Sequence, residues 1–313
     1  MYVIKNGLPK RMLPLAYFFA LAGMIGCLPA FQSNQLIQIT GDLAFSEIEN
    51  FNILGGLVLA GITGIVVIGG LKRIAEVATF LVPLMGSIYF GAMIVALILN
   101  LNLVLPAFKL ILVDAFNGTA IAGGTFFGVL IYGVRRGAFS NEAGMGTESL
   151  VHGVARVSDP VKQGLVAMTG PIFDTLIICT ATALMILVSG VWETSSSQGV
   201  TLTAEAFSIL LGNFGGLILF VCVICFGLST IFTYSYYGAS CSRFLFGKFG
   251  MKFYIYLYIL SIFIYSIVPI DIAINIADGA FAMMAIPTLI SALWLAPKVM
   301  QASKNYFKLI DNN

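Results

Sequence analysis

The densest group of polar residues lies inside an apolar stretch, between Tyr132 and Ser149. It reads Y-G-V-R-R-G-A-F-S-N-E-A-G-M-G-T-E-S, with two Arg, two Glu and four Gly. Such a density of charge and glycine does not fit a continuous lipid-facing helix, so the backbone is predicted to break here. Broken helices at membrane depth line cavities, and in secondary transporters they hold substrates and coupling ions. A cytoplasmic loop between two shorter spans is the alternative.

A second cluster, Ser229–Gly238, places several hydroxyl groups in another apolar run. Hydroxyl and carbonyl oxygens are ligands that a small cation prefers. Ser and Thr in membrane helices also commonly bond back to their own backbone, so spacing alone leaves both interpretations open. A third cluster, from Gln32 to Gln38, follows Pro29 and could line a gate or face lipid headgroups.

For the isolated carboxyl groups and the single His within the spans, structural roles are predicted. Asp174 follows Pro171 and could accept hydrogen bonds from the broken helix, and Asp278 could cap a helix start. His152 is the only His and has no metal or nucleophile motif around it, so no enzyme activity is expected.

The composition shows what kind of element must hold these groups. Of the 313 residues, 59% are apolar and 10% charged, and mean hydropathy is +0.99. Soluble domains carry about 25% charged residues. The chain is therefore predicted to be an all-α integral membrane protein. The net charge of +2 and the scattered Cys exclude a nucleic-acid binder, a disordered chain and a disulfide scaffold.

The apolar runs predict about eight transmembrane helices in a single domain, residues 1–313. Barrel strands are disfavoured because the runs are apolar on all faces for too long. No cleavable leader is expected, since the first apolar stretch continues into a full span. The predicted spans are Leu13–Ile39, Ile53–Gly70, Phe80–Leu99, Ala120–Ala155 (interrupted), Leu165–Gly190, Phe214–Ser240, Phe253–Val268 and Asp271–Ala296.

Basic residues predict the orientation. Lys and Arg gather in the N-terminal segment and in alternate connections, whereas the other connections are acidic. Since basic loops stay cytoplasmic, both ends of this chain are predicted to lie inside the cell. The largest outside loop, from Thr194, is expected to include a short helix over Thr203–Leu211.

The motif Gly133–Gly146 resembles the signature of the alanine or glycine:cation symporter family, the sodium:alanine symporters. The similarity extends over the whole chain, with further matching segments at Asp159–Met168, Phe173–Thr180, Ser235–Gly238, Asn275–Asp278 and Ala285–Pro287. It implies the leucine-transporter-type fold of two inverted five-helix repeats, with core helices three to ten present and the chain N-terminally truncated. The break predicted above falls where the family places that of its sixth core helix.

The resemblance also implies residue roles. Gln32, Thr230 and the segment Phe139, Ser140 and Asn141, taken as unwound, would bind substrate, and Ser229 with Thr230 would supply half of a sodium site. Tyr234 would form the pocket floor where we expect Trp in the family, which leaves the substrate size limit open.

These observations lead to a hypothesis of sodium-coupled symport of alanine or glycine by alternating access in the cell membrane. The expected partners are a small neutral amino acid, Na⁺ and membrane lipid, with no cofactor other than Na⁺ as coupling ion and no nucleic acid. With the first core helices absent, the chain is expected to be incomplete as given and not to transport alone. The alternatives are a proton-coupled carrier using Asp174 or Glu142, and a non-transporting membrane fragment or scaffold.

Overall fold

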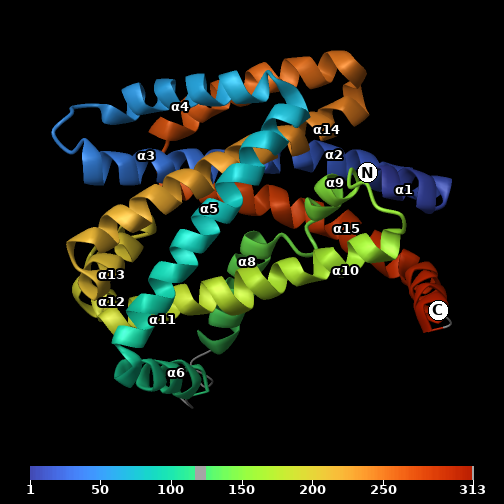
Figure 1. The fold of residues 1–313 in the computed structure, drawn as a ribbon. Coiled ribbons are helices and arrows are strands. Elements are labelled where there is room, and N and C mark those ends of the chain that lie inside the picture. Colours follow the sequence, from blue (N-terminus) through green and yellow to red (C-terminus); the bar gives the residue numbers. More distant parts are fainter. Residues whose placement is uncertain (117–124, 312–313) are drawn as a thin grey trace.

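The computed structural model describes residues 1–116 and 125–311, and every regular element within those ranges is a helix (Figure 1). The chain is thus the all-helical protein that its composition predicts. The N-terminal elements are α1 (Tyr2–Gly7), η1 (Lys10–Met12), α2 (Leu13–Gly26), α3 (Ala30–Ala44), α4 (Phe51–Val67), α5 (Gly70–Leu99) and α6 (Leu101–Ala115). The remaining elements are α8 (Thr125–Asn141), α9 (Glu148–His152), α10 (Pro160–Pro171), η2 (Ile172–Cys179), α11 (Thr180–Ser189), α12 (Val191–Thr194), α13 (Val200–Leu211), α14 (Asn213–Ile267) and α15 (Ile270–Asp311).

Five helical stretches in the described residues are long and apolar enough to cross a membrane: Lys10–Ala44, Gly70–Leu99, Pro160–Ser189, Phe214–Ile267 and Ile270–Ile310. Two of the predicted spans, Phe214–Ser240 and Phe253–Val268, form the two helical arms of α14. The arms are separated at Gly247, whose non-helical φ of 68° only glycine adopts easily. They fold back on each other, since the Tyr258 hydroxyl donates to the carbonyl of Ile231 at 2.6 Å. The expected span Ile53–Gly70 corresponds to the shorter helix α4.

Two buried clusters hold the helices together. In the larger one, α2, α3, α4, α14 and α15 meet around side chains such as Phe19, Tyr258 and Met284. In the smaller one, α5, α11, α13 and α14 pack around Met93 and Phe207. Large apolar side chains are also exposed along most of the long helices, as lipid-facing surfaces require.

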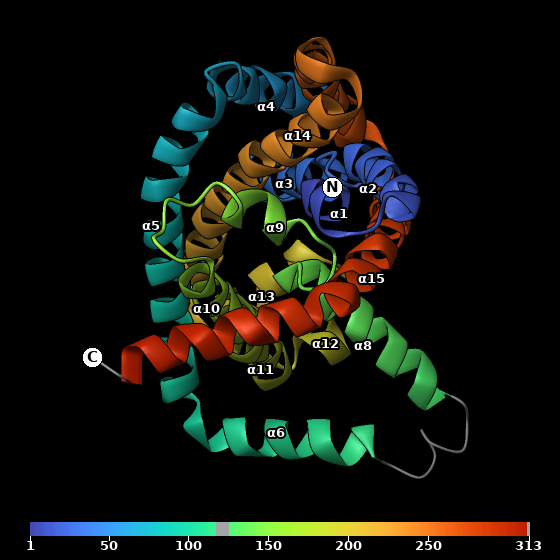
Figure 2. The same ribbon diagram turned by 90° about the vertical axis from the view of Figure 1, so that its right-hand side faces the viewer.

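The helix α5 runs diagonally from the α4 side of the bundle to α11, and α6 lies across its far end (Figures 1 and 2). The sequence predicted no helix over α6, which lies between the predicted spans Phe80–Leu99 and Ala120–Ala155. The predicted outside helix is α13, which starts a little earlier than expected, at Val200.

The predicted break in the fourth span occurs between α8 and α9. The start of that span, residues 120–124, lies outside the described residues. The helix α8 continues to Asn141, so the expectation that Phe139, Ser140 and Asn141 are unwound is wrong. Unwinding begins at Glu142, because the three residues with positive φ follow there: Glu142 at 56°, Gly144 at 80° and Gly146 at 89°.

Candidate functional site

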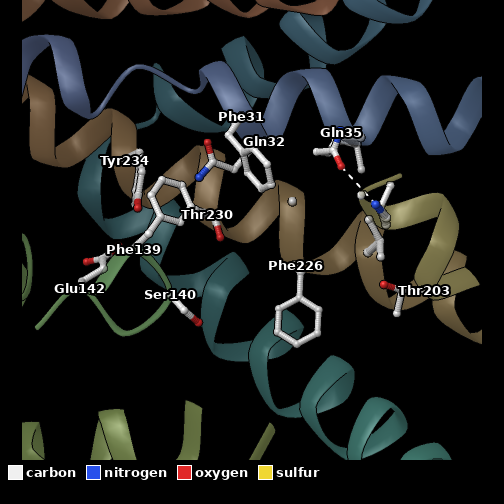
Figure 3. Close-up of a pocket in the computed structure, with 15 residues that line it drawn as sticks. Phe31, Gln32, Gln35, Phe139, Ser140, Glu142, Thr203, Phe226, Thr230 and Tyr234 are labelled. Carbon is white, nitrogen blue, oxygen red and sulfur yellow. Dashed lines mark hydrogen bonds between the residues drawn. The ribbon is translucent and has the colours of Figure 1, made fainter. Parts of the chain in front are cut away.

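A cavity of about 470 Å³ lies between α3, the C-terminal end of α8, the start of α13 and the middle of α14 (Figure 3). Its size is within the range of small-molecule sites in proteins. It is lined by Phe31, Gln32, Gln35, Leu36, Phe139, Ser140, Glu142, Gly199, Val200, Thr203, Val223, Phe226, Gly227, Thr230 and Tyr234. We call it the central cavity.

The polar groups of the central cavity come from different elements. Gln32 reaches it from α3, Thr230 from α14, and Ser140 and Glu142 from the end of α8 and the residue that follows (Figure 3). Hydroxyl, amide and carboxyl groups can together hold both ends of a polar ligand or a cation.

Aromatic rings form much of the remaining wall. The rings of Phe31 and Phe139 meet edge to face at 5.6 Å, and Phe139 meets Phe281 at 5.4 Å. Tyr234 is buried, and the centre of its ring lies 6.3 Å from the centre of the Phe281 ring. Because edge-to-face contacts restrict ring movement, these walls limit the shape of what can enter.

The unwound segment between α8 and α9 is fixed at both ends. The Asn141 side chain accepts a hydrogen bond from the backbone N–H of Ala143 at 2.9 Å. At the other end Thr288 of α15 donates to the carbonyl of Met145 at 3.2 Å. The positive-φ backbone is therefore a defined conformation that places Glu142 on the cavity.

Asp174 connects this segment to the neighbouring span α10–η2–α11. Its Oδ2 accepts hydrogen bonds from Ser140 Oγ at 2.7 Å and from Thr175 Oγ1 at 3.0 Å, and Asn141 donates to Thr175 Oγ1 at 2.9 Å. The expectation that Asp174 accepts from the broken helix is confirmed. Asp174 lies in a π-helical turn after Pro171, where the proline ring disturbs the regular hydrogen-bond pattern.

Five of the predicted site residues line the central cavity: Gln32, Phe139, Ser140, Thr230 and Tyr234. Two do not. Asn141 faces Thr175. Ser229 is buried and donates to the carbonyl of Phe226 at 2.9 Å, because neighbouring residues on a helix point about 100° apart.

Sequence reasoning missed the contribution of α13. Gly199, Val200 and Thr203 line the cavity, and the Gln35 side chain accepts a hydrogen bond from Val200 N at 3.2 Å. The polar cluster around Gln32 was the only signal in the sequence, and it did not reveal its partner.

Asp278 does not cap a helix start, since it lies inside α15. It forms an ion pair with Arg136 of α8 instead, and Arg135 Nη1 lies 3.9 Å from its Oδ2. Within the described residues, no group of three His, Cys, Asp or Glu side chains is arranged to hold a metal ion.

Known proteins are similar to this chain over its whole length. The family described as "Sodium:alanine symporter family" matches residues 1–313. Similar proteins include the sodium/alanine symporter AgcS of Methanococcus maripaludis, 34% identical over 100% of this chain and 70% of its own length. The uncharacterized transporter YflA of Bacillus subtilis is 35% identical over 98% of this chain, and the probable sodium/glutamine symporter GlnT of the same species 32% over 97%. This chain spans 66% of the length of YflA and 63% of GlnT.

Proposed function

Since this chain belongs to the sodium:alanine symporter family, we propose that it carries a small neutral amino acid, alanine or glycine, across the cell membrane together with Na⁺. The observation that carries the proposal is the position of the central cavity. It combines polar groups with aromatic walls directly beside the helix break between α8 and α9. Broken helices of this kind bind substrates and coupling ions in secondary transporters.

The chemistry of the lining supports a zwitterionic substrate. The carboxylate of Glu142 would accept hydrogen bonds from an ammonium group, and the amide of Gln32 would donate to a carboxylate. Phe139 and Tyr234 would contact a short side chain. The volume of about 470 Å³ leaves room for an amino acid together with a cation and water.

For the cation we propose a site at Ser229 and Thr230. Thr230 lines the central cavity and offers an oxygen of the type that Na⁺ prefers. The Ser229 hydroxyl now donates to the Phe226 carbonyl, so it would have to rotate in order to bind the ion.

We propose that the chain forms one transmembrane domain with a leucine-transporter-type arrangement, and that it works by alternating access with both ends of the chain on the cytoplasmic side. The start of α13 supports a moving cover, since Gly199, Val200 and Thr203 close one side of the cavity. Two hydrogen bonds tie this segment to α3, from Val200 N to Gln35 Oε1 at 3.2 Å and from Thr201 Oγ1 to Asp42 Oδ2 at 2.9 Å. A cover attached by few polar contacts can open at low energetic cost.

A glutamine carrier is the second candidate substrate class, because the similar protein GlnT is named a probable sodium/glutamine symporter. Proton coupling through Glu142 or Asp174 is a second candidate mechanism, since both carboxyls lie at or next to the helix break.

The test is uptake of radiolabelled alanine in liposomes at a fixed pH, with an inward Na⁺ gradient or an equal K⁺ gradient. Uptake is measured for this chain alone, which we expect not to transport, and for the chain completed with the first core helices that the family resemblance implies. Saturable uptake that requires Na⁺ and is inhibited by glycine more than by glutamine supports the proposal. Stronger inhibition by glutamine indicates the second substrate class, and uptake driven by a pH gradient without Na⁺ indicates proton coupling.

Measurements of alanine binding test the site residues independently of transport. Thr230→Val should weaken the dependence of alanine binding on Na⁺. Thr79→Val is the matched control, because Thr79 is exposed on α5 and its hydroxyl bonds only its own helix. Absence of any saturable alanine binding would refute the assignment of the central cavity.

A further inference from the structure

A second cavity, of about 380 Å³, lies between facing sides of α8 and α15. Its charged and polar lining consists of Arg135 on α8 and of Asn275 and Asp278 on α15. The rest of the lining is apolar and includes Phe139 and Ala282. We call it the outer cavity.

Two arginines, Arg135 and Arg136, lie near the single carboxylate of Asp278 at the outer cavity. Arg136 donates to Asp278 Oδ2 and so pairs with this largely buried carboxylate, whose side chain is 14% exposed. Arg135 lies 3.9 Å from the same oxygen, which is too long for a hydrogen bond, and its side chain is 56% exposed. The guanidinium of Arg135 therefore keeps its donors available for another anion.

Only one of the two carboxylate oxygens of Asp278 is paired with the arginines. Both arginines approach Oδ2, and no residue that the structure describes donates a hydrogen bond to Oδ1. Asn275 lies one helical turn earlier on the same side of α15 and adds an amide oxygen. A cationic group in the cavity would find two acceptors there.

A free cation and a half-free anion at one apolar cavity suit a molecule that carries both charges. Arginine binds carboxylates through two parallel N–H donors, and a carboxylate with an amide oxygen accepts from an ammonium group. The α-carboxylate and α-ammonium of an amino acid provide this pair, and the apolar wall would take a small side chain.

The outer cavity adjoins the central cavity. Phe139 lines both of them, and its ring is held by contacts with Phe31 at 5.6 Å and with Phe281 at 5.4 Å. The guanidinium of Arg136 lies 5.5 Å from the centre of the same ring. One aromatic side chain therefore separates the two sites and contacts the ion pair.

We propose that the outer cavity is a second binding subsite for a zwitterionic small amino acid, with Arg135 binding the carboxylate and Asp278 with Asn275 binding the ammonium group. This inference rests on the proposed function, because it takes the substrate of the central cavity to be the same kind of molecule. Movement of Phe139 would then connect the subsite with the central cavity.

The experiment measures how many alanine molecules bind to the purified full chain in lipid nanodiscs with NaCl present. The unaltered protein should bind two. Arg135→Gln should weaken one site by about tenfold or more, as expected for the loss of a charge-assisted pair, and leave the other site unchanged. This variant keeps the Arg136–Asp278 pair, so the fold is retained.

A second variant tests the space without changing any charge. Ala282→Phe places a ring in the outer cavity and should remove one alanine site. Ile286→Phe is its control, because Ile286 is 52% exposed on the same helix and does not line this cavity. Thr230→Val, in the central cavity, should weaken the other site only.

Binding of a single alanine that neither Arg135→Gln nor Ala282→Phe alters would overturn the second subsite while the proposed function stands. Failure to bind alanine at all would overturn both. Two sites of which only one responds to the outer-cavity variants would establish the proposal.

Discussion

A methyl group added at Gly146 is expected to destabilise the protein through the helix break itself. The Cβ of Gly146→Ala would lie 2.5 Å from Thr288 Oγ1 and 2.6 Å from Phe19 Cε2, both closer than real Cβ contacts. The residue would also have to keep a φ of 89°. Gly146 therefore combines a steric and a conformational requirement for glycine.

The magnitude follows from these two terms. A left-handed conformation costs a residue with a side chain about 1–2 kcal/mol, and overpacking a close contact costs about 1–3 kcal/mol. Gly146→Ala should lower the free energy of unfolding by about 2–5 kcal/mol, the sum of the two.

Two further glycines provide matched controls. Gly144 has a φ of 80°, but its nearest neighbour would be Leu289 at 3.7 Å, so Gly144→Ala should cost only the conformational term. Gly137 is helical with nothing within 4 Å, and Gly137→Ala should be neutral or stabilising by about 0.5–1 kcal/mol.

The assay is denaturant or thermal unfolding of the purified variants in the same detergent, followed by alanine binding. The expected order of stability is Gly137→Ala, then Gly144→Ala, then Gly146→Ala. If Gly146→Ala were as stable as Gly137→Ala, the break would not have the conformation described above, and the placement of Glu142 on the central cavity would be wrong.

Three other changes test the surroundings of the central cavity. Tyr234→Ala should admit larger side chains and improve competition by leucine against alanine by about 1–3 kcal/mol, and unchanged competition would show that this ring does not limit size. Asp174→Asn should destabilise the contact with Ser140 by about 1.5–3 kcal/mol and weaken alanine binding. Equal alanine binding by the variant and the unaltered protein would show that the hydrogen bonds of Asp174 do not support the binding site. Gln35→Ala should speed hydrogen exchange of the Val200 amide, and exchange at the original rate would show that the Gln35 side chain does not protect this amide.

Local physics made several features predictable. The helix break could be predicted within the stretch from Tyr132 to Ser149 because its charges and glycines do not suit a continuous lipid-facing helix. The contact from Asp174 to the broken helix was expected for a carboxyl next to a proline in a span. The lengths of the spans were less predictable. Phe139, Ser140 and Asn141 stayed helical because the glycines with positive φ come only after them. By contrast, the expected spans Phe214–Ser240 and Phe253–Val268 did form two separate helical arms, because Gly247 interrupts α14 between them.

By itself, the sequence determined that the chain belongs in a lipid bilayer and that its fold is all-helical. It also showed which residue types are able to bind a polar molecule. Each of these depends on composition and local backbone preferences. Only the tertiary structure decided that Val200 and Thr203 of α13 meet Gln32 at the central cavity, and that Asp278 pairs with Arg136 instead of capping a helix. These partners are more than a hundred residues apart in the chain, and they meet because packing of whole helices brings their faces together, which no local pattern encodes.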